Sequence, residues 1–267
     1  MRHLLLCGGI HGNPRSLVHL RQAATNQCPD GIFFVGSVLA PTRRCEQKMT
    51  PWSLTLEDSR FIEEFFHTLG DLKVFSAIIP GPVGEPMEEF LSLGMQAELV
   101  FPHVHLAHGT LIEEKELAVC GLGGVLAEKP LVGIDHYLRP TAEYFLRSLR
   151  WTRKSRTVLL LPAPPPGRLG GPDGDPLIGD LIDSYHPDLC VVRGSSDYRG
   201  VQRIGNTLVV NPGCLSDGWT AWLDWDRPVE DRVKFVNSTD LGYEGGECEE
   251  CAAPPTRKPE HEGVRWS

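Results

Sequence analysis

The chain has 267 residues, enough for one large domain or two small ones, and 41% of them are hydrophobic, as is usual for a globular protein. Its formal net charge of −9 argues against a nucleic-acid-binding protein, because such affinity comes mostly from Lys and Arg side chains that neutralise phosphates. The chain has no apolar stretch long enough to span a membrane and no signal-peptide core, so we expect a cytoplasmic protein that does not bind membranes.

Short runs rich in Val, Leu and Ile recur along the chain, each bounded by Gly or Pro, and they predict buried β-strands. They cover residues 3–7, 32–35, 74–79, 117–120, 158–161, 189–192 and 207–210. Between several of them lie stretches with helical spacing, at 13–25, 56–69, 86–93 and 140–149. Buried strands that alternate with helices indicate the α/β class, in which helices cover the sheets.

The last third of the chain changes character. Residues 188–237 combine short apolar runs with frequent turn signals, which predicts a strand-rich half. We expect one domain over residues 1–239 and a disordered acidic and proline-rich tail over 240–267. Residues 40–54 and 163–176 read as long loops, which in this class tend to be functional.

The cysteines favour a reducing compartment. Cys7, Cys120 and Cys190 lie in or end apolar runs, so we expect them to be buried thiols. Cys248 and Cys251 form a lone C-x-x-C in the tail, and without a second pair they are a weak indication of zinc.

The turn at residues 8–13, Gly-Gly-Ile-His-Gly-Asn, is the first candidate site. A dinucleotide-binding fingerprint would place its first glycine at Cys7, and its ribose-binding acid would fall on Asp30, before the second strand. Both positions argue against a dinucleotide site.

Six predicted strands end in small or polar clusters, and these clusters together are more informative. They lie at residues 9–13, 36–37, 80–83, 162–165, 194–197 and 211–213. In order and spacing, from His3 to about Phe235, they resemble the motifs of the calcineurin-like metallophosphoesterases: Asp-x-His-Gly-Asn, Gly-Asp, Gly-Asn-His, a His before Pro-Pro, Gly-His-x-His and Asn-Pro-Gly. The resemblance implies a four-layer αββα sandwich of two mixed β-sheets. It also implies a family chemistry in which two metal ions activate a water and a separate His assists the leaving group.

The same resemblance implies that most metal ligands are replaced in this chain. The altered positions of this degenerate site are Gly9, Ser37, Pro82, Val83, Pro162 and Ser195. Only His11 and Asp197 keep side chains that can coordinate a metal. A complete structural zinc site contributes about 10–16 kcal/mol, so the loss of two of four ligands should weaken binding by roughly four decades. We therefore expect no cofactor, or at most one weakly bound Mn²⁺ or similar ion.

Three hypotheses follow for function. The first is a catalytically inactive relative that binds a protein partner or a small ligand, with His11 and Asp197 hydrogen-bonded to each other or to nearby backbone. The second is a divergent one-metal phosphoesterase, in which Glu85 and Asp217 add to those two residues. The third is a metal-free module that binds a nucleotide or another anion through backbone N–H groups of the glycine turns. Further candidates to line the pocket are Asn13, Asn211 and Asp217.

The remaining histidines carry less weight. On a strand, His103 and His105 would share one face and His108 would take the other, so we expect no three-histidine site. His136 is predicted to lie in a loop.

Overall fold

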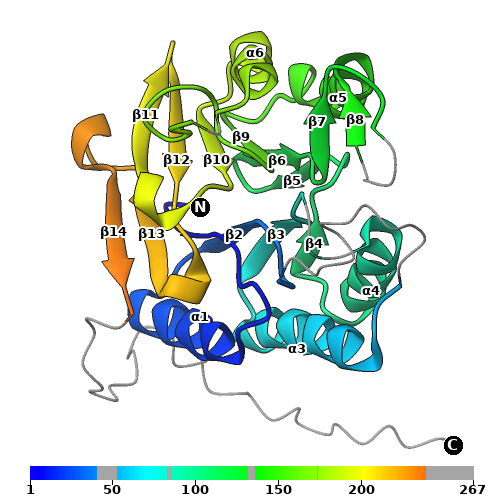
Figure 1. Ribbon diagram of the computed structural model, residues 1–267. Coiled ribbons are helices and arrows are strands. Elements are labelled where there is room, and N and C mark those ends of the chain that lie inside the picture. The colour runs from blue at the N-terminus through cyan, green and yellow to red at the C-terminus, as the bar shows by residue number, and fades with distance from the viewer. Residues whose placement is uncertain (41–52, 83, 85, 132–135, 173, 239–267) are drawn as a thin grey trace, which may run out of the picture.

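The computed structural model describes residues 1–238 apart from 41–52, 83, 85, 132–135 and 173, so the expected tail with Cys248 and Cys251 lies outside the described residues. Two six-stranded sheets dominate it (Figure 1). The first has the order β14-β13-β1-β2-β3-β4. Neighbours from β1 to β4 are parallel, while β13 is antiparallel to both β1 and β14. Its strands are β1 (His3–Cys7), β2 (Gly31–Val35), β3 (Phe75–Ile79), β4 (Val104–Leu106), β13 (Trp219–Asp224) and β14 (Val233–Asn237).

The second sheet has the order β11-β12-β10-β9-β6-β5 and is also mixed. Its four central strands are parallel, and β5 and β11 pair antiparallel at the edges. The strands are β5 (Ile112–Glu114), β6 (Leu117–Gly121), β9 (Arg156–Leu161), β10 (Leu189–Val192), β11 (Gly200–Ile204) and β12 (Thr207–Asn211). A separate parallel pair joins β7 (Val125–Ala127) to β8 (His136–Leu138).

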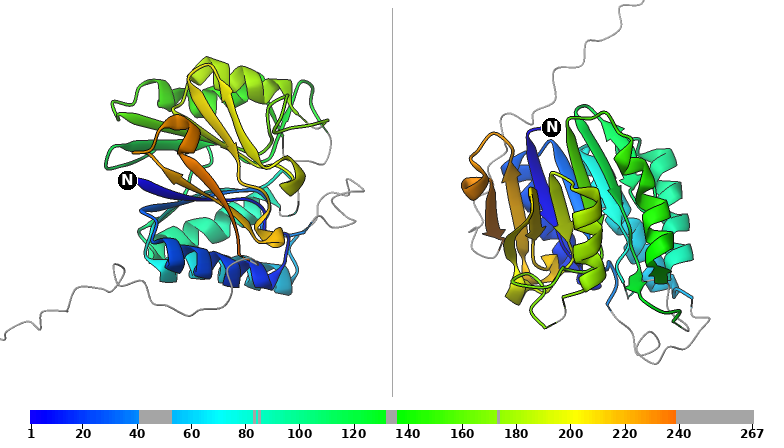
Figure 2. Two further views of the ribbon diagram at one scale, coloured as in Figure 1. Left: turned by 90° about the vertical axis from the view of Figure 1, so that its left-hand side faces the viewer. Right: turned by 90° about the horizontal axis from the view of Figure 1, so that it is seen from above.

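Helices cover the outer face of each sheet, as the views in Figure 2 show. The first sheet carries α1 (Pro14–Gln27), α3 (Leu56–Leu72) and α4 (Met87–Val100), and the second carries α5 (Arg139–Leu146) and α6 (Pro176–Tyr185). Four 3₁₀ turns complete the described elements: η1 (Arg147–Arg150), η2 (Ser196–Tyr198), η3 (Leu215–Asp217) and η4 (Val229–Asp231).

The buried side chains form three layers that match this arrangement. One cluster joins the first sheet to α1, α3 and α4, and another joins the second sheet to α5 and α6. The third lies between the sheets, where Phe33 of β2 and Leu160 of β9 are fully buried. Strands β2 and β3 are buried at every position, which explains their unbroken apolar sequences. The predicted four-layer αββα sandwich is therefore confirmed.

The predicted elements agree with the structure in position but not always in length. The helix expected at 86–93 continues to Val100, and the one expected at 140–149 becomes α5 followed by the 3₁₀ turn η1. The predicted strand-rich half contains β10 to β14. The described residues of 163–175 form neither helix nor strand, while most of the loop predicted at 40–54 lies outside the described residues.

Two local predictions have clear outcomes. The loop predicted at His136 is wrong, because this residue begins β8 and pairs with Val125. Cys7, Cys120 and Cys190 are buried free thiols, as predicted, and burial raises the pKa of the Cys120 thiol to about 11. Over the described residues, no helix combines the length and apolar character needed to cross a membrane.

Candidate site at the strand ends

The clusters at the carboxyl ends of the strands meet at the seam between the two sheets. The turn after β1 is tied to the turn after β2, because Ile10 N–H donates to the Ser37 carbonyl at 2.9 Å. It is also tied to the loop after β12, through a 3.1 Å hydrogen bond from Ser216 N–H to the Gly9 carbonyl. The turns predicted to form one site therefore lie side by side, although they come from distant parts of the chain.

His11 occupies an unusual place in this cluster. Its backbone has a φ of +54°, in the left-handed region that few non-glycine residues adopt. A Cβ atom at Gly9 would lie only 2.6 Å from the His11 Nε2 atom. The imidazole therefore fills the space that a side chain at position 9 would need.

The His11 imidazole is partly buried and favours its neutral form. Burial lowers its pKa below the usual value, and the positive charge of Arg193 lowers the pKa further. The carboxylate of Asp217 acts in the opposite direction. The Nδ1 atom of the ring is buried, and a hydrogen bond with the Leu39 backbone also raises the pKa of His11 in part.

Arg193 is the residue that the sequence analysis missed. It follows β10 directly, and its Cγ atom would lie 3.2 Å from a Cβ atom at Gly36, so the glycine lets the arginine stem pass. The Arg193 Nε atom is buried and has no hydrogen-bond partner among the described residues. The signal was present in the sequence, since a single basic residue follows the apolar run of 189–192.

The two acidic candidates differ in their surroundings. Asp197 is exposed in η2, and no ion pair within 4.0 Å joins it to His11, both of which the structure describes. These two side chains therefore do not pair with each other, and the backbone partner expected as the alternative is present for His11, whose pKa is raised in part by a hydrogen bond with the Leu39 backbone. Asp217 instead supplies the negative charge that acts on His11, and its Oδ2 atom accepts a 2.6 Å hydrogen bond from the Ser196 hydroxyl.

Asn211 and Asn13 use their amides to shape the loops. The fully buried Asn211 donates from Nδ2 to the carbonyls of Ser195 and Tyr198 at 3.1 and 3.0 Å, and its Oδ1 accepts from Gly213 N–H at 3.0 Å. Asn13 caps α1, where its side chain accepts from the backbone N–H of Arg15 at 3.1 Å. Their polar atoms thus hold the turns in place.

The other predicted positions are small or apolar. Ser37 is 1% exposed, and a Cβ atom at Gly81 would lie 2.1 Å from its hydroxyl oxygen. Pro162 is buried just after β9, and Pro82 is partly exposed. Val83 and Glu85 lie outside the described residues. Among the residues that the structure does describe, no group of three or more His, Cys, Asp or Glu side chains could hold a metal ion.

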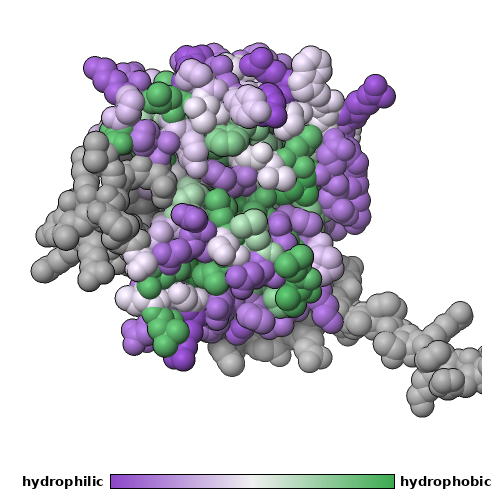
Figure 3. Space-filling view, turned by 90° about the vertical axis from the view of Figure 1, so that its right-hand side faces the viewer, coloured by the Kyte–Doolittle hydropathy of each residue, from purple (hydrophilic) through white to green (hydrophobic). Residues whose placement is uncertain are grey.

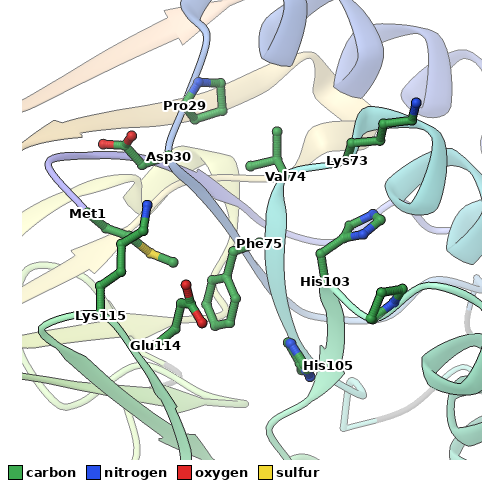
Figure 4. A pocket seen from close by; sticks show the side chains of 11 residues that line it. Met1, Pro29, Asp30, Lys73, Val74, Phe75, His103, His105, Glu114 and Lys115 are labelled. Atoms are coloured by element: carbon green, nitrogen blue, oxygen red, sulfur yellow. The ribbon is translucent and has the colours of Figure 1, made fainter. Parts of the chain in front are cut away.

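A cavity of about 310 Å³ opens at the opposite edge of the sandwich, where β1 to β4 begin. Figure 4 shows Glu114 and Lys115 on one side of it and His103 and His105 on the other, with Phe75 between them. Both histidines line this cavity, while His108 accepts a 2.9 Å hydrogen bond from Gly123 N–H. None of the residues predicted for the strand-end site lines it, so this cavity is separate from that site.

The chain matches a protein family in sequence and solved structures in fold. The family model described as "Metallophosphoesterase, calcineurin superfamily" matches residues 1–234. The crystal structure of TT1561 from Thermus thermophilus is 25% identical, with a TM-score of 0.74 over 89% of this chain and 99% of that chain. A second solved structure is 23% identical, with a TM-score of 0.73 over 88% of this chain and 98% of its own, and it shows the same fold. None of the curated proteins compared with the chain matches it.

Proposed function

We propose that this chain, which belongs to the calcineurin superfamily of metallophosphoesterases, is a catalytically inactive member that binds a small anionic ligand or a protein partner. Ligands of open α/β sheets bind outside the carboxyl ends of the strands, which is where the cluster around His11 and Arg193 lies.

The observation that carries the proposal is that an imidazole ring takes the space beside Gly9 and that a cation, Arg193, acts on that ring. The imidazole of His11 fills the space beside Gly9, so an acidic side chain at position 9 has no room while His11 stays in place. The Arg193 guanidinium adds positive charge to the same cluster. Divalent ions need deprotonated ligands and are repelled by a fixed cation, so these residues do not fit the family's two-metal centre.

Two features bear on what is bound. The cation of Arg193, which forms no ion pair among the described residues, supports a small anion. A protein partner is supported by the face that carries α4 and α5, where apolar patches alternate with hydrophilic ones (Figure 3). On α4, Met95 is 55% exposed, Leu99 88% and Val100 66%.

Metal analysis tests the proposal directly. The full chain, purified without chelator and again after incubation with Mn²⁺, should be metal-poor and inert toward aryl phosphates. Near-stoichiometric Mn²⁺ that supports turnover would contradict inactivity and favour a divergent one-metal phosphoesterase. In that case His11→Ala and Asp197→Ala should both remove the metal, while the exposed controls His67→Ala and Asp183→Ala should retain it.

A further inference from the structure

Arg193 carries the charge on which this inference rests, and it lies at the strand-end site. The structure places no carboxylate within 4.0 Å of its guanidinium and gives that group no hydrogen bond, among the residues that it describes. We propose that the Arg193 guanidinium binds the phosphate group of a ligand without any metal ion. This inference rests on the proposed function, because it assumes that no metal centre assembles at the site.

The backbone around Arg193 fixes the place of its side chain. The N–H of Arg193 donates to the Leu161 carbonyl at 3.0 Å, which ties the residue to the end of β9. The aliphatic stem then crosses Gly36, whose φ of +129° is open to glycine but strained for other residues. Two constraints from different strands thus direct this arginine into the seam.

The neighbouring carboxylates that the structure describes, Asp197 and Asp217, form no ion pair with this cation. Asp217 accepts from Ser196 at 2.6 Å and from Ser216 at 3.5 Å, and it makes no ion pair within 4.0 Å among the described residues. Asp197 is exposed in η2 and also makes none with Arg193. A bound anion would supply both the missing charge and the missing acceptor for the buried Nε–H.

Phosphate is the anion whose shape suits this group. A guanidinium presents a planar fork of N–H donors that matches two oxygens of a phosphate, and such bidentate pairs are stronger than neutral hydrogen bonds. Removal of a charged hydrogen-bonding partner typically weakens an interaction by about tenfold to a hundredfold. A lysine at this position would keep the positive charge but lack the planar pair of N–H donors, so it should preserve only part of the affinity.

The experiment titrates inorganic phosphate into the full chain in EDTA at constant ionic strength and measures the Kd by calorimetry. Wild-type protein should bind, Arg193→Gln should raise the Kd at least about tenfold, and Arg193→Lys should fall between them. Arg203→Gln is the matched control, because Arg203 is exposed on β11 and the substitution removes the same charge. Its Kd should equal that of wild type.

A second measurement is made on wild-type protein, so it does not depend on a variant that has lost phosphate binding. In ¹⁵N–¹H spectra of wild-type protein, the Arg193 Nε–Hε resonance, assigned by its absence from Arg193→Lys, should shift as phosphate is added. If Arg193→Gln fails to fold by circular dichroism, this shift decides the matter, and an unmoved resonance overturns the inference.

The outcomes separate this inference from the proposed function. Binding that requires Mn²⁺, equal Kd values for wild type and Arg193→Gln, or an equal loss in Arg203→Gln would each overturn the role of Arg193. None of those results restores catalysis. Hydrolysis of an aryl phosphate in the presence of Mn²⁺, measured on the same samples, would instead contradict the proposed inactivity.

Discussion

At the scale of single residues, two partly buried histidines resist protonation at opposite edges of the sandwich. Burial lowers the pKa of His105, and so does the nearby His103, while the carboxylates of Glu98 and Glu114 raise it in part. His11 has a lowered pKa for a related reason, with Arg193 as the neighbouring cation. Each group binds protons more readily in the unfolded chain than in the folded one.

This difference predicts how stability depends on pH. A histidine whose pKa is lower in the folded protein than in the unfolded chain costs no stability while the pH is above its unfolded pKa of about 6.5. As the pH falls below that value, the unfolded chain takes up the proton first, so the free energy of unfolding declines. The free energy of unfolding of His105→Gln should therefore fall less than that of wild type between pH 7.5 and pH 5. Urea titrations at several pH values measure this slope. Because His11 acts in the same direction, the double variant His11→Gln/His105→Gln should be flatter still, and an unchanged slope in the single variant would contradict the assignment.

A second prediction at this scale concerns Asn211. Its side chain is fully buried and satisfies two carbonyls and one N–H of the adjoining loops. Because truncation would leave these groups unpaired, Asn211→Ala should lower the free energy of unfolding by about 2–4 kcal/mol. Urea unfolding checks this value, with the exposed Asn206→Ala as a control within about 0.5 kcal/mol of wild type. A cost below about 1 kcal/mol for Asn211→Ala would mean that water replaces the amide.

At the scale of elements, the strands that could be predicted are those with continuous apolar sequence. The runs at 3–7 and 189–192 coincide with β1 and β10, because both strands are covered on two faces. Strands β4, β5, β7 and β8 have three residues each, too few for a period to emerge. The strand order of the two sheets depends on long-range pairing, which periodicity within a single strand does not reveal.

The candidate site has the same limit, because local sequence does not reveal which distant side chains meet there. Turn sequences located the strand ends, since Gly and Pro reflect local backbone geometry. Side-chain partners across the seam could not be read in this way. The motifs bring His11 and Asp197 together as candidate ligands, whereas the charged side chains that act on His11 in the structure are Arg193 and Asp217.

The start of α3 gives a prediction about one element. Thr55 and Asp58 form a reciprocal capping box, in which the Thr55 hydroxyl accepts from Asp58 N–H at 3.1 Å and the Asp58 carboxylate accepts from Thr55 N–H at 3.1 Å. Thr55→Ala removes one half of this box and should cost about 1 kcal/mol of stability. Thr55→Ser, which keeps the hydroxyl, should recover most of that loss in the same urea titration. Equal losses in both variants would point to the Thr55 methyl group instead of the cap.

At the scale of the whole molecule, the layer between the two sheets decides whether residues 1–239 behave as one domain. Side chains from both sheets share this layer, including Phe33 and Leu160. The outer layers each belong to a single sheet. A layer built from both halves couples their unfolding, so we expect a single cooperative transition, as is common for single domains.

The paired variants Leu160→Ala and Leu159→Ala test this coupling. Both side chains are fully buried on β9, but Leu160 faces the first sheet and Leu159 faces the helices of the second. Each variant should lose about 2–5 kcal/mol, the usual cost of truncating a buried leucine. Of the tryptophans that the structure describes, Trp219, Trp222 and Trp225 lie on or next to β13 and Trp151 is 81% exposed. Tryptophan fluorescence is therefore expected to report mainly on the first sheet, whereas far-UV circular dichroism reports on the whole fold. If the sandwich is one domain, both probes should give the same urea midpoint in both variants. A fluorescence midpoint that stays at the wild-type value in Leu159→Ala, while the dichroism midpoint falls, would show that the two sheets unfold separately.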